Sequence, residues 1–141
     1  ASRPVFEAFL GPDGSGRQLS HGHSYGGNAL AAAVARAHLR LVTDEGLLAQ
    51  VRERSHYLQA ELRSALLGHD LVRDVRGLGL LVGVELADAQ LARALCDRVV
   101  ARGVLLRPLG PVVPIVPPLT VTEGELAEIV AALHKELEVV A

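Results

Sequence analysis

Apolar residues recur at helical spacing over long stretches of the chain, with shorter alternating runs between them. In residues 27–42, large side chains return every three or four positions among alanines, which predicts a helix buried on more than one side. Glu45 and Gly46 interrupt this pattern. A second amphipathic helix is expected over residues 47–67, with its leucines facing inward, and a short helix over residues 4–10 precedes both.

Two later helices carry clear start or stop signals. Asp88 can cap a helix, and Gly103 is suited to end it because glycine adopts the left-handed conformation without strain. Thr122 and Glu125 have the spacing of a capping box, which predicts the start of the last helix. The residues expected on the buried stripe of that helix are Leu126, Ile129, Val130, Leu133 and Leu137.

Short apolar runs predict strands between these helices. Residues 71–75 and 80–86 are expected to form two strands joined by a tight glycine-containing turn. Residues 104–107 and 112–116 are two further strand candidates. Pro114 and the prolines that follow it restrict the last strand to an edge of the sheet or make it irregular.

The elements together predict a small α/β unit with a short, mainly antiparallel sheet and helices packed on one face. Residues 11–24 are rich in turn-forming types and predict a loop. Residues before about position 27 do not fit into the unit.

Composition excludes several classes of partner. Half of the 141 residues are apolar but 3% are aromatic, which argues against stacking platforms for nucleic acid. The formal net charge is −2, so neither nucleic acid nor an anionic membrane is an expected partner. A mean hydropathy of +0.30 is high, yet no apolar run approaches the roughly 18 residues of a membrane span. Some of the apolar surface is therefore expected to face another part of a larger protein.

Cysteine usage points to a reducing compartment. The single cysteine, Cys96, cannot form an internal disulfide, and its apolar neighbours place it on a helix as an inert residue. The N-terminus carries no pattern of a signal peptide, so we expect a cytoplasmic protein.

Residues 21–33, HGHSYGGNALAAA, place a hydroxyl, a glycine pair and a helix start in succession. The backbone amides of such a turn can bind an anion, and the Ser24 hydroxyl adds a donor. A serine before a helix also suits a plain N-cap, so the pattern alone leaves both interpretations open.

This string resembles the HGx(S/T)YxGNP segment of the class III pyridoxal-phosphate (PLP)-dependent aminotransferases. The same order continues through VRGLGL at residues 75–80, LLRPLG at 105–110 and VPPLTVTEGEL at 116–126. Ornithine aminotransferases carry an arginine three residues before PPL, where this chain has Pro114. The departure makes the pattern closest to the diaminopelargonate or ω-aminotransferase branch.

The resemblance implies roles for four residues. Ser24 and the backbone of His23 would bind the PLP phosphate of a neighbouring subunit, and Gly22 would approach the substrate. Arg107, in an RPxG setting, resembles an arginine that binds a substrate carboxylate, which its planar guanidinium can do with two hydrogen bonds. An arginine at the end of a strand is the alternative interpretation. Arg76, beside two glycines, is interpreted as a structural turn residue.

The resemblance also implies what the chain does not contain. Lys135 is the sole lysine and falls on the polar face of the last helix, so no residue here is assigned as the catalytic lysine that holds PLP. His21 and His23 lack further metal ligands nearby, and no metal site is expected.

The chain thus resembles the C-terminal portion of a fold-type I enzyme that forms homodimers and acts on small amine and keto substrates. Its expected parts are a remnant of the large domain (1–26), an interdomain helix (27–42) and the small C-terminal domain (43–141). Alone, the chain is expected to be inactive. A stand-alone, non-catalytic α/β interaction module is the alternative hypothesis.

Overall fold

The computed structural model describes residues 1–44 and 46–140, and the chain divides into two compact units, Ala1–His38 and Leu39–Ala141. The first unit begins with α1 (Arg3–Ala8), which has Pro4 in its first turn. A long loop follows without helix or strand, and α2 (Ala29–Asp44) runs on into the second unit. The predicted short helix, loop and longer helix are all confirmed.

The burial predicted for the helix at residues 27–42 is wrong for this chain. The apolar side chains of α2 are exposed, with Leu30 at 75% and Val34 at 61% of full accessibility. The alanine-rich pattern fixes the helix, but these side chains are not covered within the described residues of the first unit. Its apolar surface is therefore bare, as the high mean hydropathy of the chain anticipated.

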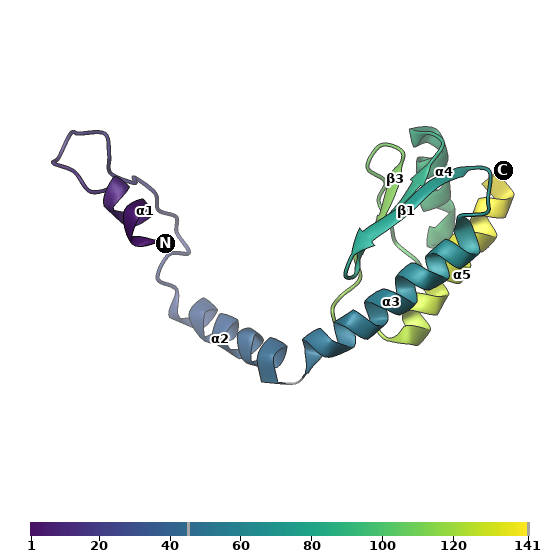
Figure 1. Ribbon diagram of the computed structural model, residues 1–141, viewed down its shortest axis with the longest axis horizontal. Helices are drawn as coiled ribbons and strands as arrows, with labels where there is room; N and C mark the ends of the chain where they lie inside the picture. The colour runs from purple at the N-terminus through teal and green to yellow at the C-terminus, as the bar shows by residue number, and fades with distance from the viewer. Residues whose placement is uncertain (45, 141) are drawn as a thin grey trace. The chain divides into compact units, whose positions relative to one another are not determined.

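The second unit is an α/β domain built on three antiparallel strands, β1 (Val72–Leu78), β2 (Leu81–Leu86) and β3 (Val112–Ile115), in the order β1-β2-β3 (Figure 1). Its helices are α3 (Leu47–Leu66), α4 (Ala89–Val99), the 3₁₀ turn η1 (Val100–Arg102) and α5 (Glu123–Val140). α3 packs against β1, α4 packs against β2 and β3, and α5 packs against both α3 and α4. The predicted fold class is thereby confirmed.

The core lies between the sheet and these helices. It contains the inward residues of the strands, such as Val82 and Val113, and the leucines predicted for the helices, such as Leu62 and Leu126. The opposite face of the sheet carries polar side chains. There Arg76 pairs with Asp74 at 3.0 Å and also with Glu85. Arg76 therefore lies on a strand and not in the turn that we predicted.

The helix boundaries follow the predicted signals. Asp88 Oδ1 accepts hydrogen bonds from the amides of Gln90 and Leu91, both at 2.8 Å, and Gly103 ends η1 with φ of 81°. At α5, the Thr122 amide donates to Glu125 Oε2 at 2.7 Å and the Glu125 amide donates to Thr122 Oγ1 at 3.2 Å. The capping box is confirmed. Gly46 caps α3 with φ of 65°, whereas Glu45 lies outside the described residues.

The strand predicted over residues 104–107 is wrong. This segment has no regular secondary structure, and the sheet ends at β3. Its apolar alternation suits a strand, but a strand also needs a partner, and the backbone groups of residues 105–107 have none among the described residues.

The edge position predicted for the last strand is confirmed by the pairing of β3. The Leu86 amide donates a hydrogen bond to the carbonyl of Pro111. Hydrogen-bonded and non-hydrogen-bonded residue pairs alternate from this pair along the β2–β3 ladder. In an antiparallel pair, every second residue then directs its backbone groups away from the partner strand. Pro114 is one of these residues, so its missing N–H costs the sheet no hydrogen bond.

Candidate functional site

Gly22, His23 and Ser24 lie together in an exposed stretch of loop that leads into a turn over residues 24–27. The carbonyl of His23 accepts a hydrogen bond from the amide of Gly26 at 2.9 Å. His23 Nδ1 accepts another from the amide of Tyr25 at 3.2 Å. Since Nδ1 acts as an acceptor, the proton of the neutral His23 ring lies on Nε2.

The helix that follows is capped by Asn28 and not by Ser24. Asn28 Oδ1 accepts a hydrogen bond from the amide of Ala31 at 2.9 Å, and α2 begins at Ala29. Asparagine is among the preferred N-cap residues, so GGN followed by an alanine run could have identified this cap from the sequence. The interpretation of Ser24 as a plain cap is therefore excluded.

The loop offers several hydrogen-bond donors that the protein itself does not use. Within residues 1–44 and 46–140, the Ser24 hydroxyl and the amides of Gly22, His23 and Ser24 form no hydrogen bond. A hydroxyl beside consecutive free amides is a donor set that suits an oxyanion such as a phosphate. The residues present thus fit a phosphate group chemically.

Arg107 lies in the second unit, directly before the buried Pro108, with its side chain exposed. It forms no ion pair with any described residue. A guanidinium without a protein partner is available for a carboxylate. The structure thus groups Gly22, His23 and Ser24 in one unit and places Arg107 in the other.

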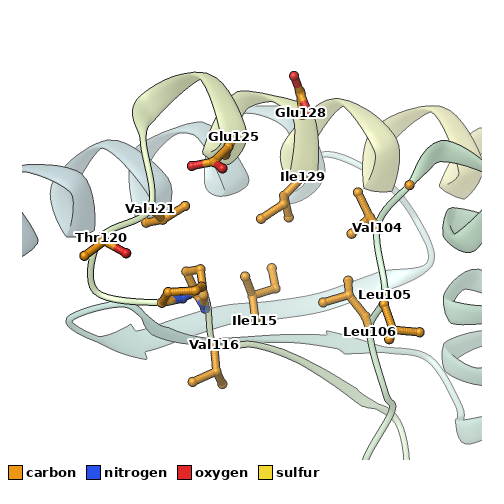
Figure 2. A pocket seen from close by; sticks show the side chains of 13 residues that line it. Val104, Leu105, Leu106, Ile115, Val116, Thr120, Val121, Glu125, Glu128 and Ile129 are labelled. Carbon is orange, nitrogen blue, oxygen red and sulfur yellow. The ribbon is translucent and has the colours of Figure 1, made fainter. Parts of the chain in front are cut away.

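A hollow of about 470 Å³ lies beside Arg107 but does not include it. Figure 2 shows Ile129 of α5 and Ile115 of β3 pointing into this space from opposite sides, with Val104 and Leu106 along one border. Of the polar residues in the lining, Glu125 is already engaged by the cap of α5. The amide and the hydroxyl of Thr122 both donate hydrogen bonds to Glu125 Oε2, and these bonds lower the pKa of the Glu125 carboxyl. Polar and apolar surface both line the hollow.

The most enclosed charged residue among those described was not singled out from the sequence. Glu136 is 5% exposed and accepts hydrogen bonds from Arg102 Nε at 2.5 Å and Arg98 Nε at 2.6 Å. The bond from Arg102 lowers the pKa of the Glu136 carboxyl most, and Arg98 adds to this effect against the opposing influence of burial. Arg98 lies at the end of α4 and Arg102 on η1, so this cluster joins both elements to α5 and serves the fold.

Cys96 is a helix residue of α4 and is buried, as predicted. Burial raises the pKa of its thiol, which disfavours the reactive thiolate. In the described part of the chain, His, Cys, Asp and Glu form no group of three that could hold a metal ion. No helix among those residues combines the length and hydropathy of a membrane span.

The α/β domain and the donor-rich loop belong to one known class of transferases. The chain is a member of the class III aminotransferase family, whose model matches residues 5–137. The enzymes of this family depend on PLP.

Relatives with different names match this chain. It is 47% identical over 108 residues to the ornithine aminotransferase of Bordetella pertussis, a match that covers 75% of this chain and 26% of that protein. It is 31% identical over 145 residues to the adenosylmethionine-8-amino-7-oxononanoate aminotransferase of Methanocaldococcus jannaschii, covering 95% of this chain and 31% of the relative.

Solved structures of aminotransferases are also similar to this chain. The crystal structure of the M. jannaschii enzyme matches with a TM-score of 0.82 over 95% of this chain and 33% of its own length. A thermostable omega transaminase from Pseudomonas jessenii matches at 30% identity with a TM-score of 0.81, over 88% of this chain and 30% of that structure. The chain thus spans about a quarter to a third of the proteins it resembles.

Proposed function

We propose that residues 1–141 serve as the C-terminal part of a PLP-dependent aminotransferase, which moves an amino group from an amine donor to a keto acceptor. The observation that carries this proposal is the loop at residues 22–24. Its free amides and hydroxyl form a phosphate-suited donor set at the position that resembles the family's phosphate-binding motif.

In this proposal, the backbone of His23 and the hydroxyl of Ser24 hold the PLP phosphate, and Gly22 lies near the bound substrate. Since the loop is exposed, these groups are accessible to a second protein surface, and we assign them to a homodimer in which they act on the neighbouring subunit. When bound, PLP supplies the electron sink that amino transfer requires. The loop residues fix the position of its phosphate.

Arg107 orients the substrate by a bidentate hydrogen bond to a carboxylate. Pro114 stands where ornithine aminotransferases have an arginine, and a proline side chain offers no donor for an α-carboxylate. We therefore favour an amine donor of the diaminopelargonate or ω-amine type.

We place the enzyme in the cytoplasm because its single cysteine is buried and free, which is typical of a protein in a reducing compartment.

The lysine chemistry of the reaction must come from outside these residues. Lys135, the only lysine, is exposed near the C-terminal end of α5. We propose domain limits of 1–26, 27–42 and 43–141 for the large-domain remnant, the interdomain helix and the small domain. The bare apolar surface of α2 supports this arrangement over a stand-alone interaction module.

The isolated chain provides the first test. Incubation with PLP followed by borohydride reduction should label no lysine specifically, and no amino transfer should be detected. Stoichiometric labelling of Lys135 would contradict the proposal.

The coding sequence upstream of Ala1 is the second test. A strand with an aspartate, followed by a lysine before a glycine, is expected there, whereas a start codon directly before Ala1 would favour the interaction module.

The longer polypeptide tests the individual residues. Ser24→Ala should weaken PLP binding about tenfold, because one charge-assisted hydrogen bond is lost. Ser20→Ala, in the same exposed loop, should not weaken it.

Arg107→Lys should raise KM for carboxylate-bearing substrates by roughly 10- to 100-fold and leave KM for amines without a carboxylate unaffected. Arg73→Lys, at another exposed arginine, is the control.

A further inference from the structure

The side chain of His23 closes a short hydrogen-bonded ring with the backbone of the loop. Its Nδ1 atom accepts a hydrogen bond from the amide of Tyr25 at 3.2 Å, two residues further along the chain. Nδ1 of a histidine lies as many bonds from the backbone as Oδ1 of an asparagine, so the arrangement has the form of an Asx turn. The imidazole thereby holds the peptide that joins Ser24 to Tyr25.

The backbone of His23 holds the same turn a second time. Its carbonyl accepts a hydrogen bond from the amide of Gly26 at 2.9 Å. The approach is close, because a Cβ on Gly26 would lie 3.2 Å from that oxygen. His23 thus supplies the acceptors for the two amides that directly follow Ser24. The conformation of Ser24 is restricted by both bonds, since it lies between the acceptors and the donors.

Two neighbouring rings restrict the rotation of the His23 imidazole. The ring of His21 lies edge-on to it with centroids 6.0 Å apart, and the ring of Tyr25 is tilted with centroids 6.2 Å apart. These distances are typical of paired rings in proteins. Both contacts favour the orientation in which Nδ1 faces the Tyr25 amide.

The donors suited to a phosphate lie directly beside these bonds. They are the amides of Gly22, His23 and Ser24 and the Ser24 hydroxyl, which have no partner within the described residues. Several donors must converge on one phosphate, and a loop that has to be ordered at the moment of binding loses affinity. A turn that is fixed beforehand therefore binds the phosphate more tightly.

We propose that the His23 imidazole is a positioning residue for the PLP phosphate. Through Nδ1 it orders the turn that follows Ser24 and so preorganises the donors of residues 22–24, while its ring does not contact the phosphate. The inference rests on the proposed function, in which only the backbone of His23 binds the cofactor. It adds a role for the side chain.

Two substitutions separate the hydrogen bond from the ring contacts. His23→Asn keeps an acceptor at the place of Nδ1 and removes the ring, whereas His23→Phe keeps a ring and removes the acceptor. PLP binding to the longer polypeptide is measured by equilibrium titration. His23→Phe should weaken it roughly 2- to 10-fold, because one hydrogen bond is lost. His23→Asn should bind PLP within about twofold of the parent.

Pyridoxal, which lacks the phosphate, makes the measurement specific. Its affinity for His23→Phe should equal that for the parent within about twofold, whereas a general disturbance of the site would weaken both ligands. His69→Phe is the matched control variant. His69 Nδ1 accepts a hydrogen bond from the Leu71 amide at 3.2 Å, so the same local bond is lost in the second unit, at a residue with no assigned phosphate contact. PLP binding should not change in this variant.

Three results would overturn the proposal. They are a PLP affinity of His23→Phe equal to that of the parent, an equal loss in His23→Asn and His23→Phe, or an equal loss for PLP and pyridoxal. Ser24→Ala tests the proposed function separately. If Ser24→Ala weakens PLP binding and His23→Phe does not, the phosphate site stands and the positioning role of His23 is wrong. If neither variant weakens it, both proposals are wrong.

Discussion

Arg102, at the end of η1, donates a hydrogen bond of 2.5 Å to Glu136, which lies 34 positions later on α5. Arg98 completes the cluster from α4 at 2.6 Å. The carboxylate is almost fully enclosed while both arginines keep an exposed side. The carboxylate of Glu136 thus holds α5 against α4 and η1.

Replacing this carboxylate should destabilise the domain. Glu136→Gln keeps the shape of the side chain but removes the charge that the two arginines neutralise, leaving strong donors poorly satisfied. We expect the Tm to fall by several degrees. Glu128→Gln makes the same chemical change at an exposed position of α5 and should leave the Tm unchanged. Equal Tm values for the two variants would contradict the assigned role of Glu136.

The same carboxylate predicts a loss of stability in acid. Arg102 lowers the pKa of Glu136 in the folded state below the ordinary glutamate value of about 4.3. Its stabilisation is fully present above that value. Below it the unfolded chain takes up the proton first, so stability falls until the pH passes the folded pKa. Urea denaturation between pH 6 and pH 3 should show this decline, and Glu136→Gln should make it shallower. An equally steep decline in the variant would argue against this linkage.

Asp88 should stabilise α4 as its N-cap. Asp88→Ala removes the acceptor of two amide hydrogen bonds and should lower the free energy of unfolding by about 1 kcal/mol. Asp88→Asn retains an acceptor at the cap and should lie close to the parent. Urea denaturation measures both variants, and a cost for asparagine as large as that for alanine would exclude a capping effect.

Gly77 should tolerate no side chain. A Cβ at this position would lie 2.6 Å from the carbonyl oxygen of Leu81 and 2.9 Å from Val82, so the hairpin of β1 and β2 would have to shift. We expect Gly77→Ala to destabilise the domain by roughly 1–3 kcal/mol. Gly68→Ala is the control, because nothing lies within 4 Å of the added atom there. A neutral Gly77→Ala would mean that the strands approach less closely than the structure shows.

Ser24 should contribute nothing to the fold. Its side chain is exposed and its hydroxyl has no partner among the described residues. Ser24→Ala should change the free energy of unfolding of the 141-residue chain by less than about 0.5 kcal/mol. Thermal and urea denaturation check this value, and a larger loss would give Ser24 a structural role in place of the proposed phosphate contact.

Local signals were sufficient for much of the fold. The caps at Asp88 and Thr122 were readable because a cap involves residues two or three positions apart. The edge position of β3 was readable because Pro114 cannot donate to a neighbour on that side. The motif at residues 21–28 pointed to the family, and the helix start it contains was correct to within two residues.

Features that depend on distant partners were not readable from the chain. Asn28 could have been recognised as the cap of α2, but the choice between Asn28 and Ser24 depends on where the turn over residues 24–27 places each side chain. Residues 104–107 carry a strand pattern, yet a strand exists only where another strand offers hydrogen bonds. The burial predicted for α2 needs a surface that the described residues do not provide.

By itself, then, the sequence determined the helices, the caps at Asp88 and Thr122, the edge strand and the family, because each depends on neighbours in the chain or on a short motif. The tertiary structure alone decided the burial of Glu136 and the close approach at Gly77. It also decided that residues of β3 and α5 line one hollow. Helical periodicity places Glu136 on a face of α5. That face is a favourable site for a charge only because Arg98 and Arg102, from other elements, donate hydrogen bonds to the carboxylate there.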